Sequence, residues 1–316
     1  MRYPRDMPVY ILDKPLGLSS HDVVARARKR LQTRRVGHAG TLDPLATGVL
    51  LLLSEEATKL SPFLSASNKH YLAWVSFGAS TATLDAEGPV LEHGDASSLS
   101  AEAVAAALPA FLHCSLQHPP QYSAIKQGGV KGYQAARRGE TLDLPARPAG
   151  YTQVHLLEFA AHRDALVTDL AVRSQGRVPY DVALPPVLGD FPTALIALEV
   201  QAGTYIRAFA RDLGEALGVP AHLSGLVRNQ AGRASLERAI TLEALEPASQ
   251  HDPLGLLPYP QRQLSDEEAQ RVRQGQRLAM QLEQRSALID PAGQLVAIAE
   301  SLEGRFSLLR VWHKPL

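Results

Sequence analysis

Residues 35–50 hold the densest group of side chains that could take part in chemistry, in the order RVGHAGTLDPLATGVL. Asp43 is the carboxylate of this segment, and the proline after it disfavours helical backbone at residue 43. The glycines around it allow a ligand to approach the backbone closely. One ionised carboxylate beside such a loop could perform catalysis. Asp-Pro is equally good turn material, so composition alone leaves a plain turn open.

Several other catalytic signatures are absent from the sequence. It has no G-x-x-x-x-G-K-[ST] phosphate loop, no H-E-x-x-H zinc motif and no G-x-S-x-G nucleophile elbow. His113, Cys114 and His118 lie close together without a fourth ligand nearby, so we expect no metal site. Cys114 is the one cysteine, which excludes an internal disulfide.

Hydrophobic patterning predicts the elements that must position residues 36–48, which we expect to form a loop. A helix should begin at Ser19 or Ser20, which can cap it, with Val23 and Ala27 on its apolar face. A second helix, 205–217, should end near Gly218. We expect a further helix after the apolar run 49–53, on the evidence of Ala57, Leu60 and Leu64, and another at 101–112. Strands should lie at 9–12, 49–53, 71–77 and 194–200, with two more within 150–172.

Proline-rich sequence divides the chain into predicted domains. Residues 1–250 should form one domain, in which 174–193 is a loop insertion because it is rich in proline and glycine. Residues 251–260 should form a linker. Residues 261–316 should form a small β-rich domain, which begins with a helix capped by Ser265 and continues with three short strands.

The 32 basic and 32 acidic residues balance, but their distribution is uneven. Basic side chains occur without an acidic one between residues 23 and 42 and again between 103 and 139. Such runs can form a local basic face on a neutral protein, although solvated helix faces would look the same. The basic residues are Arg26, Arg28, Lys29, Arg30, Arg34 and Arg35 in the first run, and Lys126, Lys131, Arg137 and Arg138 in the second.

Residues 9–245 resemble the tRNA pseudouridine-55 synthases of the TruB family. The resemblance rests on a block of some fifteen residues around Asp43 and on further blocks in the family's order. These are LDKPLGLSS at residues 12–20, KHY at 69–71, residues 78–88, PPQYSAIK at 119–126 and GTYIR at 203–207. It implies an α+β pseudouridine synthase fold, with a mixed, mainly antiparallel sheet flanked by helices and loops. Residues 261–316 match the family's C-terminal, RNA-binding PUA domain in size and placement.

The resemblance also implies roles for individual residues. Asp43 matches the catalytic aspartate that enables cleavage of the C1′–N1 bond of the target uridine, a reaction that needs no cofactor. Arg207 matches its arginine partner, and a neighbouring cation favours an ionised carboxylate. Tyr71 matches the tyrosine that stacks on the target base, and Tyr205 matches a second active-site tyrosine.

Other positions are implied to bind the RNA. His38 matches the side chain that holds open the gap left by the extruded base. Lys14 and Pro15 are expected to shape the pocket floor and the Asp43 loop, together with Gly40 and Thr41. The remaining expected contacts are Leu226 at an apolar active-site position, and Lys126 and Arg137 among the phosphate-binding residues.

The implied partner is the T-arm stem-loop of tRNA. The enzyme is expected to be a cytoplasmic monomer that needs no protein partner and does not associate with a membrane. This sequence departs from the family pattern at residues 200–203 and 226–228. Two other functions stay open: a guide-RNA-dependent relative, and a non-catalytic tRNA-binding or folding factor. An unrelated hydrolase is a third, but glycosidases usually need a second carboxylate and none is apparent in these motifs.

Overall fold

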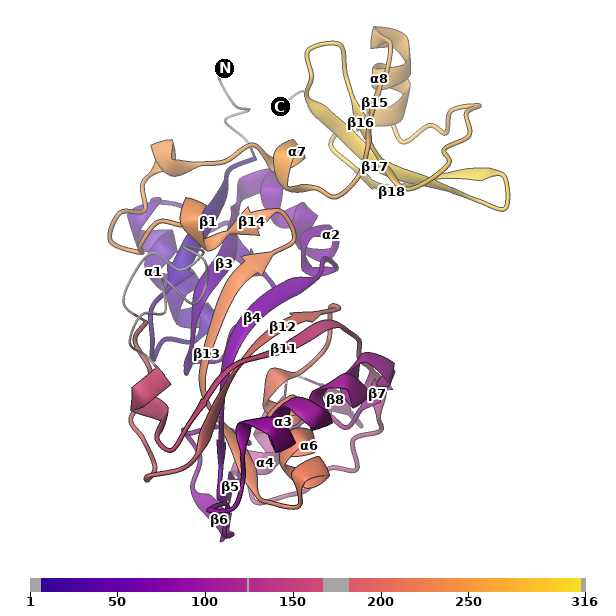
Figure 1. Cartoon of the computed structure of the whole chain (residues 1–316). Coiled ribbons are helices and arrows are strands. Elements are labelled where there is room, and N and C mark those ends of the chain that lie inside the picture. Colours follow the sequence, from indigo (N-terminus) through magenta and orange to yellow (C-terminus); the bar gives the residue numbers. More distant parts are fainter. Residues whose placement is uncertain (1–6, 124, 167–181, 314–316) are drawn as a thin grey trace.

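The computed structural model describes residues 7–123, 125–166 and 182–313 (Figure 1). Its centre is a large sheet made of β1 (Val9–Lys14), β2 (Val36–Ala39), β3 (Ala46–Ser54), β4 (Lys69–Phe77), β11 (Tyr151–Ala160), β12 (Thr193–Val200), β13 (Ala221–Ala231) and β14 (Ala234–Ser235). The strand order is β1–β3–β13–β4–β12–β11, with β2 beside β3 and β14 beside β13. Only β13 and β3 pair in parallel among these strands. The predicted α+β fold with a mixed, mainly antiparallel sheet is therefore confirmed.

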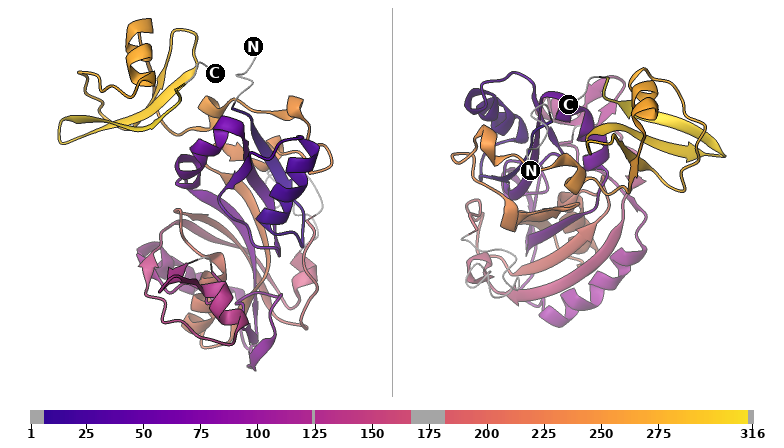
Figure 2. Two further views of the ribbon diagram at one scale, coloured as in Figure 1. Left: turned by 180° about the vertical axis from the view of Figure 1, so that it is seen from behind. Right: turned by 90° about the horizontal axis from the view of Figure 1, so that it is seen from above.

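Both faces of this sheet are covered, as Figure 2 shows. All nine residues of β3 are buried. Leu50 and Leu52 join a core that includes apolar residues of α1 (Ser20–Arg30), α3 (Ala101–Ala107) and α6 (Ile206–Leu217). Leu51 and Leu53 join a second core, with α2 (Ser61–Ser65). Successive side chains of a strand point to opposite faces, which explains the continuous apolar run at 49–53.

Local signals fix the ends of the two helices that flank the Asp43 loop. The Ser19 side chain accepts a hydrogen bond from the Asp22 amide, and the Asp22 carboxylate accepts one from the Ser19 amide, so α1 begins with a capping box. Gly218 ends α6 in a left-handed conformation with φ of +71°. The helices predicted at these two places are confirmed.

The central strand β13 was not predicted. Its sequence, AHLSGLVRNQA, lacks the apolar alternation of a typical strand, yet its first eight residues are buried. The polar groups find partners inside the protein: the His222 ring donates to the Ala79 carbonyl, and Ser76 donates to Ser224. Because these partners lie far away in the sequence, periodicity could not reveal the strand.

Other expectations differ from the structure at element boundaries. The predicted loop 36–48 is wrong at both ends, because residues 36–39 form β2 and β3 already begins at Ala46. The helix expected after the apolar run 49–53 is a 3-10 helix (Glu55–Leu60) followed by α2. The helix at 101–112 ends at Ala107 and continues as a 3-10 helix (Leu108–His113). Further 3-10 helices are Arg163–Leu166, Leu236–Arg238 and Pro247–Ser249.

Two predictions fall partly outside the described residues, which omit 167–181. Of the two strands expected within residues 150–172, the structure describes one, β11. Of the expected insertion at 174–193, residues 182–192 contain no helix or strand, and β12 begins at Thr193.

The C-terminal residues form a second sheet to one side of the first (Figure 1). Its strands pair in the order β15 (Gln261–Gln263), β16 (Ser286–Ile289), β17 (Leu295–Leu302) and β18 (Arg305–Val311), and α8 (Asp266–Arg273) begins at the predicted cap Ser265. Trp312 is 1% exposed, and its ring nitrogen lies 3.3 Å from the Glu56 carbonyl. The predicted linker contains α7 (Pro253–Leu256), and Leu256 is buried. The division into domains stays a prediction.

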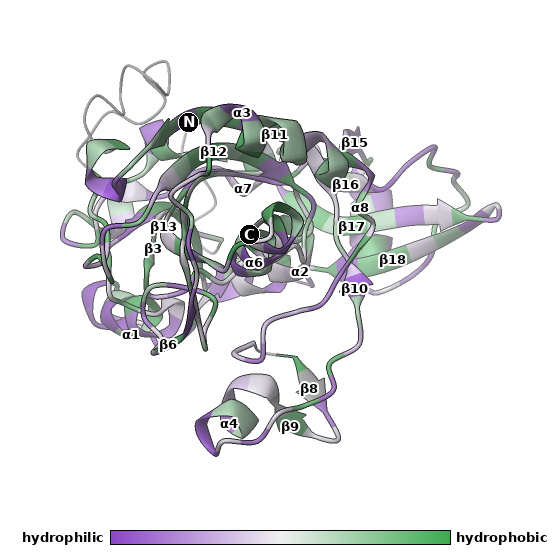
Figure 3. Ribbon diagram, turned by 60° about the horizontal axis from the view of Figure 1, so that its bottom comes forward, coloured by the Kyte–Doolittle hydropathy of each residue, from purple (hydrophilic) through white to green (hydrophobic). Residues whose placement is uncertain are grey.

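A smaller segment stands apart from the large sheet (Figure 3). It comprises β8 (Lys126–Gln127), β9 (Val130–Lys131) and α4 (Gly132–Arg137). The pair β7 (Leu116–Gln117) and β10 (Arg147–Pro148) joins its two ends.

A last pair, β5 (Ala79–Thr81) and β6 (Val90–His93), follows β4. No helix in the described part of the chain has the length and apolar character needed to cross a bilayer.

Candidate functional site

Asp43 and Arg207 meet across the site although they are far apart in sequence. Asp43 lies in the loop between β2 and β3, and Arg207 lies in the first turn of α6. The Arg207 Nε and Asp43 Oδ2 atoms are 2.8 Å apart, with side-chain exposures of 6% and 35%. Arg207 also donates from Nη1 to the Thr83 carbonyl and from Nη2 to the Tyr122 carbonyl, each at 3.0 Å. The arginine is therefore held rigidly, while the aspartate stays accessible.

A second carboxylate, Asp85, belongs to the same cluster and was not predicted. Its Oδ2 lies 3.6 Å from the Arg207 Nε, and its side chain is 4% exposed. Burial raises the pKa of Asp85, against the opposing effect of Arg207. The expectation that no second carboxylate lies in these motifs was wrong. Asp85 stands within residues 78–88, and the resemblance of that block was the signal that could have singled it out.

Arg228, in β13, holds the Asp43 loop from behind. It is 1% exposed, and it donates to the carbonyls of Val49 at 2.7 Å, Gly40 at 2.9 Å and Thr41 at 3.3 Å. Gly40 has φ of +81°, which favours glycine. An added Cβ at Gly40 would lie 3.5 Å from the Arg228 Nη1. Residue 228 was seen in the sequence only as part of a departure from the family pattern.

Lys14 fixes the other side of the loop. This fully buried residue donates from Nζ to the carbonyls of Pro15 at 2.8 Å, Leu18 at 2.6 Å and Pro44 at 3.3 Å. Burial lowers the pKa of Lys14 to about 8, with nearby Glu87 and Asp43 opposing the shift. Lys14 and Pro15 therefore shape the loop around Asp43, and they do so through backbone carbonyls.

The two tyrosines and Leu226 lie on elements that converge on the site. Tyr71, 8% exposed, pairs with Arg228 across β4 and β13. Leu226, 5% exposed, pairs with Ala46 just after the Asp43 loop. Tyr205 precedes α6, and its amide donates to the Gln117 side chain at 3.0 Å. Burial raises the pKa of Tyr205, while the nearby Arg207 opposes the shift.

His38 lies in β2, beside the loop. Its ring stands edge-on to His21, with 5.5 Å between ring centroids. Burial lowers the pKa of His38, and His21 and Arg228 act in the same direction. In the described part of the chain, its buried Nδ1 has no hydrogen-bond partner. The ring is thus available to a ligand at this end of the loop, where Thr41 is exposed.

Arg137 and Lys126 lie in the segment that stands apart, not among these residues. Arg137 is exposed, and its guanidinium carbon lies 5.7 Å from the centre of the Tyr133 ring. The side chain of Lys126 is outside the described residues. The segment does reach the site through its base, since the Tyr122 carbonyl accepts from Arg207.

The six basic residues expected to form a face on and after α1 are all exposed, and three of them also bond to the protein itself. Arg28 donates to the Val36 carbonyl and Arg30 to the Leu245 carbonyl, and Arg35 pairs with Glu55 and Glu56. These three arginines connect parts of the protein. Arg26, Lys29 and Arg34 are exposed as well, and they are the cations of this run that we assign to an external partner. Among the described residues, no group of three or more His, Cys, Asp or Glu could hold a metal ion.

Comparisons with known proteins find relatives of this chain over nearly its whole length. The family described as TruB family pseudouridylate synthase (N terminal domain) matches residues 28–176. A Thermus thermophilus protein named tRNA pseudouridine synthase B is 50% identical, over 98% of this chain and 99% of its own. One of the same name from Deinococcus radiodurans is 45% identical, over 97% and 100%.

Solved structures show the same fold at lower identity. A chain in a Cbf5–Nop10–Gar1 complex is 22% identical, with a TM-score of 0.67, over 99% of this chain and 88% of that chain. One in an H/ACA RNP bound to a substrate RNA containing 2′-deoxyuridine is 23% identical, with a TM-score of 0.63, over 98% and 85%. The predicted pseudouridine synthase fold is confirmed. With relatives this similar over nearly its whole length, the chain belongs to the TruB family of pseudouridylate synthases.

Proposed function

We propose that this protein converts a uridine of tRNA to pseudouridine, and that the target is position 55 in the T-loop. The observation that carries the proposal is the ion pair of Asp43 and Arg207, at 2.8 Å, with an accessible carboxylate. It occurs in a chain 45–50% identical to proteins named tRNA pseudouridine synthase B. This similarity does not favour the guide-RNA-dependent alternative.

The reaction is an isomerisation and needs no cofactor. The C1′–N1 bond breaks, the base rotates, and C5 bonds to C1′ while a proton leaves C5 and one is gained at N1. Asp43 would attack the base, attack the sugar, or remove a sugar proton, and each route requires an ionised carboxylate. Arg207 supplies the neighbouring cation, and its two carbonyl partners keep it in place.

The target base must leave the folded T-loop to reach Asp43. Extrusion costs a few kcal/mol, which an inserted side chain offsets by holding the gap open. His38 would be the inserted side chain, and its position on β2 beside the Asp43 loop supports this role. The Tyr71 ring would stack on the extruded base, and Tyr205 would close the opposite side. Leu226 would provide an apolar contact.

The rest of the RNA would be held through its shape and its phosphates. Arg26, Lys29, Arg34 and Arg137 are exposed cations that would serve this task. Lys126, whose side chain lies outside the described residues, would join them. The sheet β15–β18 would act as a PUA-like RNA-binding domain. We propose that a single chain performs the reaction in the cytoplasm, without an obligatory protein partner.

Tritium release from a T-arm stem-loop labelled at C5 of the target uridine tests this function. The wild-type protein should release tritium, whereas Asp43→Asn should release none above background while still binding the RNA. Equal release by both proteins would contradict the assignment to Asp43. Binding without release by either protein would favour the tRNA-binding or folding factor instead.

A further inference from the structure

The backbone of His38 is held by α2, and the residue after it is buried behind β2. The Ser61 hydroxyl, at the start of α2, donates to the His38 carbonyl at 2.9 Å. Ala39 is 3% exposed and packs in the second core, whereas the His38 ring stands edge-on to His21 of α1. Successive residues of a strand point to opposite faces. The position of the His38 ring therefore depends on what packs behind β2.

Contacts from the C-terminal residues hold α2 in turn. Trp312 follows β18, and its ring nitrogen donates to the carbonyl of Glu56, in the 3-10 helix that leads into α2, at 3.3 Å. The Phe63 ring of α2 stands edge-on to the Tyr259 ring, with 6.3 Å between the ring centroids. The Tyr259 ring also lies 5.7 Å from the guanidinium carbon of Arg285, directly before β16. Thus α2 connects β2 to the C-terminal sheet.

The second core is shared by the two sheets. It contains apolar residues of β2, β3 and α2 and, from the C-terminal sheet, Ala287, Leu295 and Ile298. Protein interiors are close-packed and transmit strain, and the structure around a new cavity relaxes partly into it. Loss of the Trp312 side chain would leave such a cavity near α2. A shift of α2 would then move the Ser61 hydroxyl and, with it, the strand that carries the wedge.

We propose that docking of the C-terminal sheet positions His38 for insertion into the RNA, and that Trp312 and Ser61 are positioning residues for this step. The proposal rests on the proposed function, in which His38 fills the gap left by the target base. The C-terminal sheet then influences the reaction rate through α2, in addition to any RNA that it binds itself. Loosening His38 should therefore slow the reaction more than it weakens RNA binding.

Single-turnover tritium release with saturating enzyme tests the coupling. Ser61→Ala removes the donor, Trp312→Ala removes the packing, and each is also combined with His38→Ala. A displacement of about 1 Å can cost 10²-fold in rate, so a smaller shift should cost each single variant about tenfold. In the His38→Ala background, the same substitutions should have no further effect, because their loss acts through the missing side chain. Losses that multiply with that of His38→Ala would overturn the proposal.

Two observations keep this test clear of misfolding and of weaker RNA binding. Trp312→Phe keeps an aromatic ring in the core and should retain most of the rate. Ser61→Ala leaves the second core intact, so its Kd for the T-arm stem-loop, measured by filter binding, should match that of the wild type. A loss for Ser61→Ala that appears in Kd and not in the rate would contradict the proposal.

A measurement without RNA reports on His38 directly. Burial lowers the pKa of His38, and His21 and Arg228 act in the same direction. In an NMR titration of the imidazole protons, assigned with His38→Ala, the pKa of His38 should rise toward its ordinary value in Ser61→Ala and in Trp312→Ala. An unchanged His38 titration in both variants would overturn the proposal. If the proposed function fails, no protein releases tritium, but the titration still gives an answer.

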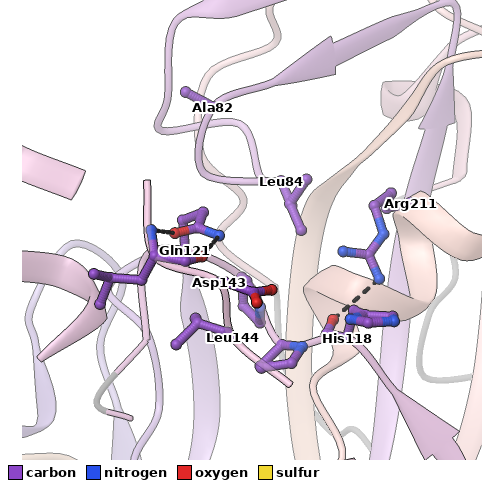
Figure 4. Close-up of a pocket in the computed structure, with 10 residues that line it drawn as sticks. Ala82, Leu84, His118, Gln121, Asp143, Leu144 and Arg211 are labelled. Atoms are coloured by element: carbon purple, nitrogen blue, oxygen red, sulfur yellow. Dashed lines mark hydrogen bonds between the residues drawn. The ribbon is translucent and has the colours of Figure 1, made fainter. Parts of the chain in front are cut away.

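Two control variants separate positioning from a general loss of stability. Val272→Ala opens a cavity in a separate core, inside the C-terminal sheet and α8, and should keep both the rate and the His38 titration. Gln121→Ala frees a wall of the hollow beside α6 shown in Figure 4, where Gln121 donates to the Leu142 carbonyl at 2.8 Å and accepts from its amide at 3.0 Å. Its loss of rate should multiply with that of His38→Ala. Coupling as strong as that of Ser61→Ala would overturn the assignment to α2.

Discussion

Replacing Arg228 by methionine should lower kcat far more than its effect on folding explains. The substitution removes the donors for the carbonyls of Val49, Gly40 and Thr41. Thr41 is exposed, so water can replace its lost bond. The other two acceptors cost about 1–3 kcal/mol each when they lose their donor, which predicts a loss of roughly 2–6 kcal/mol of unfolding free energy. A domain stable by about 5–15 kcal/mol can remain folded after such a loss at moderate temperature.

The effect on activity comes from the freed loop. A displacement of about 1 Å at the reacting groups can cost 10²-fold in rate, so we expect kcat to fall about 100-fold. KM should change little, because most expected RNA contacts lie elsewhere. Arg228→Lys should recover only part of the rate, since one ammonium group cannot span carbonyls on both the loop and β3.

The rate is measured as single-turnover tritium release with enzyme in excess. The stability of each protein is measured separately by urea unfolding. The matched control is Arg163→Met, which removes another buried arginine, 6% exposed, that donates to the Ser224 carbonyl at 2.8 Å. This control should lose stability and keep its rate. A full rate in Arg228→Met, or an equal loss of rate in Arg163→Met, would refute the reasoning.

Three further predictions follow from the same geometry. The pKa of Lys14 is about 8 in the folded protein and 10.5 when unfolded, so the contribution of Lys14 to stability rises with pH between these values. In urea unfolding, the unfolding free energy of the wild type should gain about 2 kcal/mol over that of Lys14→Met from pH 8 to 9.5. A difference that stays constant with pH would contradict this. Gly48→Ala should lower the unfolding free energy by about 3 kcal/mol or more, because φ of residue 48 is +97° and the new Cβ would lie 2.3 Å from the Arg228 carbonyl oxygen. Calorimetry tests this, and an unchanged Tm would be inconsistent with the packing. If four exposed cations contact phosphates, T-arm affinity should fall about 10²-fold between 50 and 200 mM salt, and a fall of 10³-fold or more would indicate at least six contacts.

The sequence was sufficient where the signal is local. Ser19 and Gly218 mark helix ends because capping depends on residues within a few positions. The strand at 49–53 was predictable because its apolar run is continuous. In the same way, the Asp43 loop could be singled out because its residues are contiguous and match a family block.

The sequence was insufficient where burial depends on distant partners. The charge of Arg228 is tolerated in the core only because Val49 and Gly40 turn their carbonyls toward it. Asp85 is likewise buried beside an arginine more than a hundred residues away in the chain. Distant acceptors also escaped the sequence on α1, where the exposed Arg28 and Arg30 each donate to a carbonyl of the protein itself.

The position of Trp312 has a consequence for the order of folding. This residue follows β18 and is buried in the second core, which also contains Phe63 of α2 and Leu53 of β3. During synthesis, the larger part of the chain leaves the ribosome long before Trp312 does, and domains fold from the N-terminus onward. The apolar surface that Trp312 covers is therefore exposed until translation has passed β18. Docking of the C-terminal sheet onto the large sheet is then a late folding step, and it buries that surface.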